Sequence, residues 1–227
     1  MNNKEAWERE YKDSTFLTKK FEPQKSVVDF FKFLRKKEGV ICNGKRLLDL
    51  GCGIGRNSFY AESLGFSVTG IDISNTAISL GLLHAQEIGS TINLQQGSMG
   101  EKFPYKDEEF DCVLDVTSSN SLNENEREIY IQEMCRTLKQ GGYLYVRALC
   151  KDGDANAKIL LQTFAGKEKD TYVLPEQKIT ERVWTKKEFI EYYERYFKII
   201  FLEIKESYTR MGDRTYKRRF IVCYMKK

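Results

Sequence analysis

The 227-residue chain lacks the features that mark membrane, secreted or metal-dependent proteins. No apolar run reaches about 18 residues and the first twenty residues are charged, so neither a transmembrane helix nor a signal peptide is predicted. The six cysteines include no C-x-x-C pair, and at least three lie in apolar runs. We expect a cytoplasmic globule with reduced cysteines, whose core needs no metal ion or disulfide.

Histidine is also scarce, since His84 is the single one. It falls within a predicted helix, where a solvent-facing position is expected, so a mechanism based on histidine is disfavoured and no catalytic residue is assigned. The net charge is only +4, but it is unevenly placed. Residues 180–227 contain 13 Lys and Arg against 7 Asp and Glu, which leaves about −2 for the rest.

The basic residues of this C-terminal part cluster around one predicted turn. The cluster comprises Arg210, Arg214, Lys217, Arg218 and Arg219. Such a cluster either binds phosphates, as in nucleic-acid recognition, or is a solvated turn whose charges protect an edge strand. We favour the second interpretation.

Apolar strand-like runs alternate with helical patterns along most of the chain, without repeats or low-complexity linkers. This alternation predicts an α/β fold with a doubly wound, mostly parallel sheet and helices on both faces. The expected strands are 47–50, 66–72, 92–96, 110–116 and 143–146, and the expected helices include 4–13, 55–64, 75–88 and 124–138.

The pattern changes after Ala148. Residues 150–184 carry few regular signals and follow the fifth strand, so we expect a lid or substrate loop above the carboxyl end of the sheet. A helix is expected over 186–197, and two strands over 199–208 and 216–225 form a C-terminal antiparallel hairpin.

The most informative segment runs from Leu47 to Asn57, an apolar strand that leads through three glycines into a helix. Gly51, Gly53 and Gly55 allow a sharp turn and a close approach of the backbone to a ligand. The helix that follows presents unpaired N–H groups to an anionic group. A G-x-G-x-x-G fingerprint for NAD would place its third glycine where Arg56 stands, so a dinucleotide is disfavoured.

Asp49, Gly51, Gly53 and Gly55 instead match the acidic residue and G-x-G-x-G of the first motif of class I S-adenosylmethionine (SAM) methyltransferases. The chain resembles this family over residues 45–150. The resemblance implies a seven-stranded sheet, SAM as cofactor, and Asp72 as the carboxylate that accepts both ribose hydroxyls. Further cofactor contacts are implied for Arg56, Ile73, Ser98, Met99, Asp115 and Val116.

Ser98 and Asp115 are expected to lie near different parts of the cofactor. Ser98 stands where the family usually has an acidic residue near the adenine amino group, which shifts weight to packing of Met99 on the purine face. Asp115 ends the fourth strand and is expected to orient the amino group of the cofactor. Taken singly, each motif has a structural alternative, such as a turn or a helix cap; together they indicate one crevice at the carboxyl ends of the strands.

Three residues are candidates for substrate contact. Trp7 and Tyr11 are spaced i, i+4 on an N-terminal helix and are expected to fold over the cofactor, with simple helix packing as the equal alternative. Arg147 ends the fifth strand and is predicted either to hold an anionic substrate or to form a surface salt bridge.

The sequence therefore predicts a single methyltransferase domain without indicating an oligomeric state. Its expected parts are a helical cap (1–40), a SAM-binding core (45–150), a lid (150–184), and a helix with a hairpin (185–227). Enzymes that methylate exocyclic amines of DNA bases usually carry an Asn or Asp, two prolines and an aromatic residue after the fourth strand, where this chain has Asp-Val-Thr-Ser. Methylation of cytosine at carbon 5 needs a nucleophilic cysteine, typically beside a proline, and no cysteine here adjoins one. Both kinds of DNA methylation are therefore disfavoured. We expect methyl transfer to an O, N or S nucleophile of a small molecule. The alternatives are an RNA or nucleotide methyltransferase using the basic hairpin, and a non-catalytic SAM-binding regulatory module.

Overall fold

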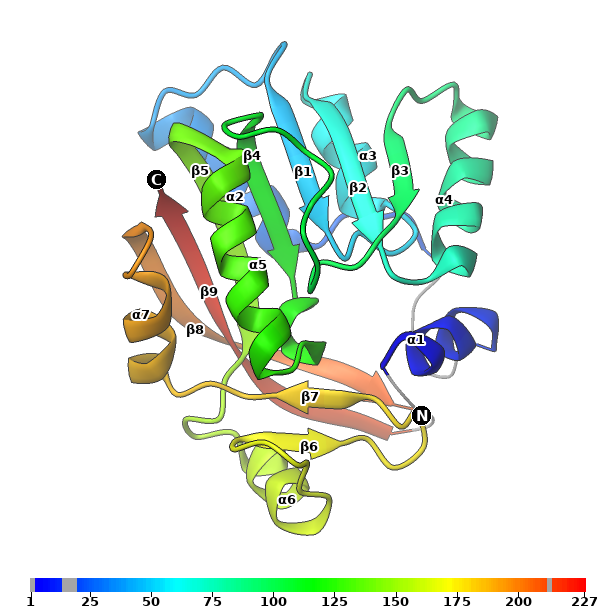
Figure 1. The fold of residues 1–227 in the computed structure, drawn as a ribbon, viewed down its shortest axis with the longest axis vertical. Coiled ribbons are helices and arrows are strands. Elements are labelled where there is room, and N and C mark those ends of the chain that lie inside the picture. Colours follow the sequence, from blue (N-terminus) through cyan, green and yellow to red (C-terminus); the bar gives the residue numbers. More distant parts are fainter. Residues whose placement is uncertain (1–2, 14–19, 212–213) are drawn as a thin grey trace.

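The computed structural model describes residues 3–13, 20–211 and 214–227. Its centre is a seven-stranded sheet in the order β3-β2-β1-β4-β5-β9-β8 (Figure 1). The first five strands are parallel, whereas β9 is antiparallel to β5 and β8 is antiparallel to β9. The expected mostly parallel sheet with a C-terminal antiparallel hairpin is confirmed. The strands of this sheet are β1 (Arg46–Leu50), β2 (Ser67–Asp72), β3 (Asn93–Gln96), β4 (Phe110–Val116), β5 (Leu138–Leu149), β8 (Lys198–Met211) and β9 (Arg214–Lys226).

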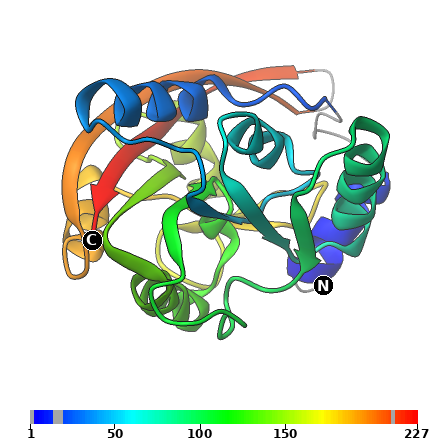
Figure 2. The same ribbon diagram turned by 90° about the horizontal axis from the view of Figure 1, so that it is seen from above.

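Helices cover both faces of the sheet (Figure 2). Side chains of successive strand residues point to opposite faces, so Leu47 and Leu48 belong to different apolar clusters. One cluster joins the sheet to α2 (Lys25–Lys37), α3 (Arg56–Ser63) and α4 (Asn75–Ile88). The other joins it to α5 (Glu124–Thr137) and α7 (Lys186–Tyr193). Both faces are therefore buried, as a parallel sheet requires.

Residues 150–184 form a small folded unit, which corrects the expectation of an irregular loop. They contain α6 (Ala155–Thr163) and an antiparallel pair of short strands, β6 (Thr171–Val173) and β7 (Thr180–Arg182). An apolar cluster joins Tyr172, Leu174 and Val183 of this unit to Phe220 of β9 and to Ala6 of α1 (Asn3–Lys12). In Figure 1 this unit lies beyond the carboxyl ends of the parallel strands, so the expected position above the sheet is confirmed although the expected irregularity is not.

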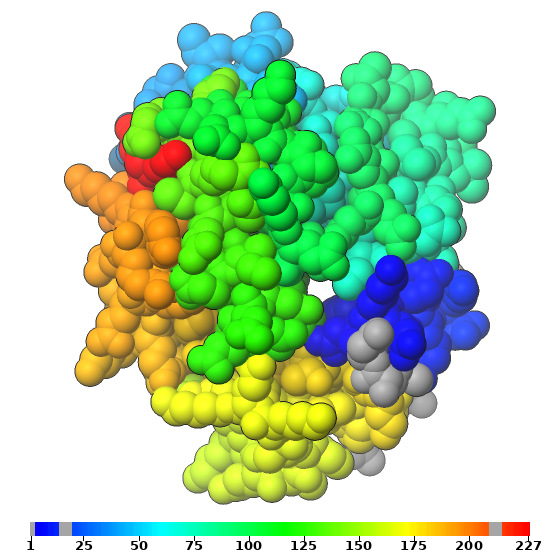
Figure 3. Space-filling model, viewed as in Figure 1, coloured from blue at the N-terminus to red at the C-terminus, as the bar shows by residue number. Residues whose placement is uncertain are grey.

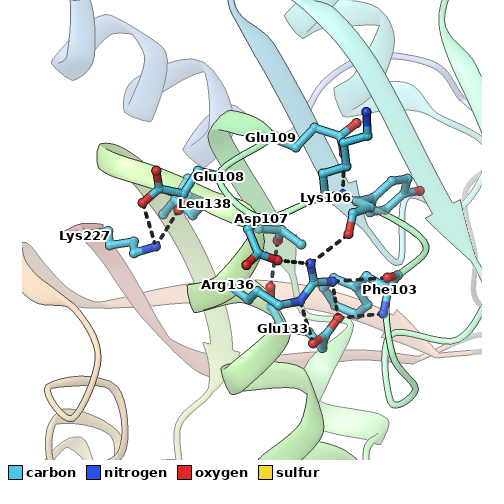
Figure 4. Close-up of polar contacts among 11 residues, drawn as sticks. Phe103, Lys106, Asp107, Glu108, Glu109, Glu133, Arg136, Leu138 and Lys227 are labelled. Carbon is cyan, nitrogen blue, oxygen red and sulfur yellow. Dashed lines mark hydrogen bonds and ion pairs between the residues drawn. The ribbon is translucent and has the colours of Figure 1, made fainter.

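The loop between β3 and β4 is fixed by Arg136 of α5 (Figure 4). Its guanidinium donates to the carbonyl oxygens of Phe103 and Tyr105 and forms ion pairs with Glu133 and Asp107. Glu133 also accepts a hydrogen bond from the N–H of Phe103 at 2.8 Å. These contacts hold the loop that begins just after β3 and carries the predicted adenine-side residues.

In the described part of the chain, no helix is both long and apolar enough to cross a membrane. The one histidine does not face solvent freely: the His84 ring stacks on Phe21, with ring centroids 3.6 Å apart, and contacts Phe59 edge-on. A packing role accounts for it.

Candidate active site

A cavity of about 1170 Å³ lies at the carboxyl ends of β1, β2, β4 and β5. Figure 3 shows the hollow at the surface, between α1 (dark blue) and the green residues in front of the sheet. Its walls come from the parallel strand ends, α1, the β6–β7 unit and the β8–β9 hairpin. Pockets for one small ligand measure about 300–1,000 Å³, so this cavity is slightly larger than that range.

The glycine loop forms the floor of the cavity, and Gly51, Gly53 and Gly55 all have positive φ, at 63°, 58° and 85°. A Cβ at Gly51 would lie 2.3 Å from Cβ of Ser118, and a Cβ at Gly53 would lie 2.5 Å from the hydroxyl of Tyr11. The first clash of a side chain at either position would thus be with protein atoms. Glycine is required here by the backbone conformation as well as by close packing.

Asp72 ends β2 inside the cavity, as predicted. Its carboxylate accepts hydrogen bonds from the N–H of Gly53 and from the N–H of Ser74, both at 2.9 Å. Each carboxylate oxygen has a second lone pair, so ribose hydroxyls can still be accepted. Burial raises the pKa of Asp72 to about 6, although the two N–H donors favour its ionised form.

Two predicted cofactor residues, Asp49 and Asp115, are not among the residues that line the cavity. Asp115 is completely buried: its carboxylate accepts hydrogen bonds from the N–H groups of Ser118 and Ser119 and from the hydroxyl of Tyr130. Asp49 accepts a hydrogen bond from the hydroxyl of Ser58 at 2.7 Å and lies behind the loop. Both carboxylates lie inside the protein at the strand ends, where hydrogen bonds from neighbouring protein groups satisfy them.

The other predicted site residues all border this one cavity. Those on the cofactor side are Gly51, Gly53, Arg56, Asp72, Ile73, Ser98, Met99 and Val116, and the predicted substrate residues are Trp7, Tyr11 and Arg147. Residues far apart in the sequence are therefore brought together as the motif pattern indicated.

Helix α1 forms one wall and is attached at three places. Glu8 accepts hydrogen bonds from the Ser74 hydroxyl and from the N–H and hydroxyl of Thr76, at the amino end of α4. These bonds lower the pKa of Glu8 to about 2, against an opposing effect of burial. Trp7 donates to the Ser121 hydroxyl at 3.2 Å, and Asn3 bonds the backbone of Thr180 in β7. Helix α1 thus covers one side of the cavity, and the contact of Trp7 and Tyr11 with the cofactor stays a prediction.

Two arginines enter the cavity from different elements. Arg56 begins α3 directly after the glycine loop, and Arg147 stands on β5 beside the end of β4. The guanidinium carbon of Arg147 lies 3.4 Å from the centroid of the Phe220 ring. Burial lowers the pKa of Arg147 to about 10; the nearby Tyr145 opposes this shift and the positive charge of Arg56 adds to it.

A buried polar chain borders the opposite side of the cavity and was not predicted. The Tyr172 hydroxyl donates to Oε2 of Glu181 at 2.7 Å and accepts from Arg218 at 2.9 Å. Arg218 also donates to Asp154 at 3.0 Å. Burial raises the pKa of Glu181, while Arg218 and the Tyr172 hydroxyl lower it. Glu181 and Arg218 both line the cavity.

These hydrogen-bonded side chains also correct the expectation that the basic residues of the hairpin form an exposed cluster. Arg218 is buried with Asp154, and Lys217 pairs with Glu206 at 2.7 Å. Arg219 donates to the carbonyl oxygen of Asp152. The side chains of Arg210 and Arg214 lie outside the described residues. The hairpin cations that are described are therefore engaged with the protein itself.

The chain is similar to known methyltransferases in both sequence and structure. A family model described as a methyltransferase domain matches residues 41–195. The chain belongs to this methyltransferase family. A SAM-dependent methyltransferase from Methanosarcina mazei has a similar structure, with a TM-score of 0.71, 28% identity, and coverage of 81% of this chain and 92% of that one.

Curated relatives of the methyltransferase are similar over the core. The ubiquinone biosynthesis O-methyltransferase of Paraburkholderia phymatum is 33% identical over 133 residues, which is 58% of this chain and 54% of the relative. Phosphoethanolamine N-methyltransferase 3 of Arabidopsis thaliana is 30% identical over 109 residues, 48% of this chain and 22% of that one. The chain thus matches about half the length of the first of these relatives and less than a quarter of the second.

SAM is the cofactor of class I methyltransferases, and the residues of this methyltransferase fit it. The cradle between the glycine loop and Asp72 would receive the ribose, since Asp72 retains free lone pairs. Arg56 and the amino end of α3 supply positive charge for a carboxylate. Ser98 and Met99 line the cavity where the adenine is predicted to lie.

Proposed function

We propose that the protein transfers the methyl group of SAM to an oxygen, nitrogen or sulfur atom of a small molecule. The observation that carries this proposal is the single cavity that extends from the glycine loop to the β6–β7 unit. Its volume lies slightly above the range for pockets that hold one small ligand, and it extends beyond the strand ends to side chains of α1, β7 and β9. A cofactor and an acceptor would meet in this one cavity.

SAM supplies a methyl group that is already bonded to a positively charged sulfur, so the protein mainly aligns the reactants and excludes water. Helix α1 and the β6–β7 unit would provide this exclusion, since they cover the carboxyl edge of the sheet. A neutral O–H or N–H acceptor also has to lose a proton. Glu181 is the carboxylate that we propose as its recipient, because no described residue hydrogen-bonds its Oε1 and it borders the cavity.

The two alternatives are less well supported. An RNA methyltransferase using the basic hairpin would need exposed cations, whereas Arg218 is buried and Lys217 is paired. A non-catalytic SAM-binding module would have little use for the second half of the cavity. Neither alternative explains why Glu181 borders that half.

The test is transfer of labelled methyl from SAM into a cell extract that is then separated into small molecules, RNA and protein. Label in the small-molecule fraction is expected. Label in RNA would contradict the proposed acceptor class. Binding of SAM without label in any fraction would contradict catalysis and favour the regulatory module.

A further inference from the structure

The guanidinium of Arg147 has no anionic partner among the described residues. Of the described arginines, the two that are buried are neutralised: Arg127 pairs with Glu168 at 2.7 Å, and Arg218 pairs with Asp154 at 3.0 Å. Arg147 instead contacts the Phe220 ring through one face, and no described residue accepts a hydrogen bond from its N–H groups. Its side chain borders the open cavity and has no acceptor among the described residues, so an anionic ligand in the cavity is expected to be its partner.

Among the described residues, the wall of the cavity supplies no carboxylate that pairs with Arg147. Of the carboxylates that line the cavity, Asp72 accepts two N–H donors, Glu181 accepts the Tyr172 hydroxyl, Asp29 pairs with Lys25 and Glu206 pairs with Lys217; none of these four forms an ion pair with Arg147. The other arginine of the cavity, Arg56, acts on Arg147 with a charge of the same sign. This part of the cavity therefore carries unbalanced positive charge and attracts an anion.

The position of Arg147 assigns that anion to the acceptor. In the sheet order, β2 with Asp72 and β5 with Arg147 are separated by β1 and β4. At about 4.8 Å per strand this separation is about 14 Å. Arg56, at the end of the glycine loop, is placed for the carboxylate of the cofactor, whereas Arg147 lies beyond β4, next to Phe220 and Val222 of β9.

The contact with Phe220 also defines the shape of the ligand. One face of the planar guanidinium is covered by the ring, so its N–H edge stays available for an oxyanion that binds edge-on with two parallel hydrogen bonds. Apolar side chains of Val116, Leu149 and Val222 border the cavity nearby. One guanidinium among apolar walls matches a single carboxylate on an apolar body.

Resting on the proposed function, we infer that the methyl acceptor is an organic acid whose carboxylate is held by Arg147 and is not itself methylated. The methylated product therefore keeps its negative charge. This inference names a substrate class and a binding residue for it.

The first experiment uses the full chain, labelled SAM and a small-molecule extract, and passes the products over an anion exchanger at mildly alkaline pH. Retained label is expected for the unaltered protein. Arg147→Gln should lower the labelled product at least about tenfold, the effect of losing charge-assisted hydrogen bonds. Arg195→Gln, on the surface beyond α7, is the matched control and should leave it unchanged. A labelled product that flows through the exchanger would overturn the inference but leave methyl transfer intact.

The second experiment does not depend on turnover. Protein saturated with S-adenosylhomocysteine is titrated with benzoate and with its neutral analogue benzamide by calorimetry. Benzoate should bind more tightly, and only while Arg147 is present. Equal binding of the two probes, or none of benzoate, would refute an anion site. A tenfold loss of S-adenosylhomocysteine affinity in Arg147→Gln would assign Arg147 to the cofactor and refute it too. Thermal unfolding is the folding control, and Arg147→Gln should melt no lower than the unaltered protein.

Discussion

The ionisation of Asp72 gives the sharpest test of the cofactor site. We expect Asp72→Asn to bind S-adenosylhomocysteine about 10–100-fold more weakly than the unaltered protein. The substitution removes a charged acceptor of ribose hydroxyls, and a hydrogen bond to a charged group contributes about 1.5–3 kcal/mol. It also turns an amide donor toward one of the two N–H groups, of Gly53 or Ser74, that the carboxylate now accepts.

The dependence on pH separates these two effects. Because the pKa of Asp72 in the free protein is raised to about 6, binding should weaken about tenfold for each pH unit below 6. Stability changes in the opposite direction. The folded pKa lies above the ordinary value of 3.8, so the ionised form of Asp72 lowers stability above pH 6, and this loss of about 3 kcal/mol is recovered as pH falls toward 3.8.

The assay is calorimetric titration with S-adenosylhomocysteine between pH 5 and 7.5. The acid limb should be present in the unaltered protein and absent in Asp72→Asn. Burial also raises the pKa of Asp49, to about 7, but Asp49→Asn should keep the limb, since that residue does not line the cavity. Glu191→Gln, at an exposed carboxylate of α7, controls for general charge effects. The same pH profile in Asp72→Asn and the unaltered protein would refute the reasoning.

Three further substitutions test how the walls of the site are held. Glu8→Gln should loosen α1 and speed hydrogen exchange over residues 3–13 at neutral pH; the depressed pKa of Glu8, about 2, means that this stabilisation is complete above pH 4.5 and is lost as pH falls through 2. Arg136→Gln should lower the free energy of unfolding in urea by about 2–3 kcal/mol, because charge-assisted bonds to the β3–β4 loop disappear. Gly51→Ala should destabilise the protein by about 1–3 kcal/mol and weaken S-adenosylhomocysteine binding, because the new Cβ meets Ser118. A change of less than about 0.5 kcal/mol for either of the last two would contradict these contacts.

The glycine loop and the parallel strands could be predicted because their signals are local. β1 and β4 are mainly apolar and are buried along most of their length, as strands covered on both faces are. Ser74 precedes a helix that was expected at the residues where α4 is found, and its hydroxyl accepts the N–H of Ala77 as a helix cap. Asp72 follows directly from its place at a strand end.

The substrate side could not be predicted in the same way. β6 and β7 have only three residues each, too few for a periodic pattern, and tertiary contacts with Phe220 and α1 stabilise them. Glu181 therefore carried no signal. The burial of Arg218 depends on Asp154, which lies 64 residues away in the chain. The cluster of basic residues around the predicted turn therefore gave no indication that Arg218 is buried. Asp115 is completely buried, and its position at a strand end does not tell whether a carboxylate faces the cavity or the protein interior.

The same far wall yields a prediction about proton transfer. Glu181→Gln keeps the size of the side chain and an oxygen that can accept the hydrogen bond of Tyr172, but it cannot take up a proton. If Glu181 receives the proton of the acceptor, kcat should fall about 10²–10⁴-fold, while KM and the affinity for S-adenosylhomocysteine change little. Tyr172→Phe, which removes the neighbouring hydroxyl, should have a smaller effect.

The pH profile distinguishes this role from a structural one. In the unaltered protein kcat should rise with pH as Glu181 ionises, with a midpoint above the ordinary value for glutamate, because burial raises its pKa. In Glu181→Gln this rise should be lost. A variant that kept the acid limb of the profile, or that lost activity only through a higher KM, would show that Glu181 shapes the cavity and that the acceptor gives up its proton elsewhere.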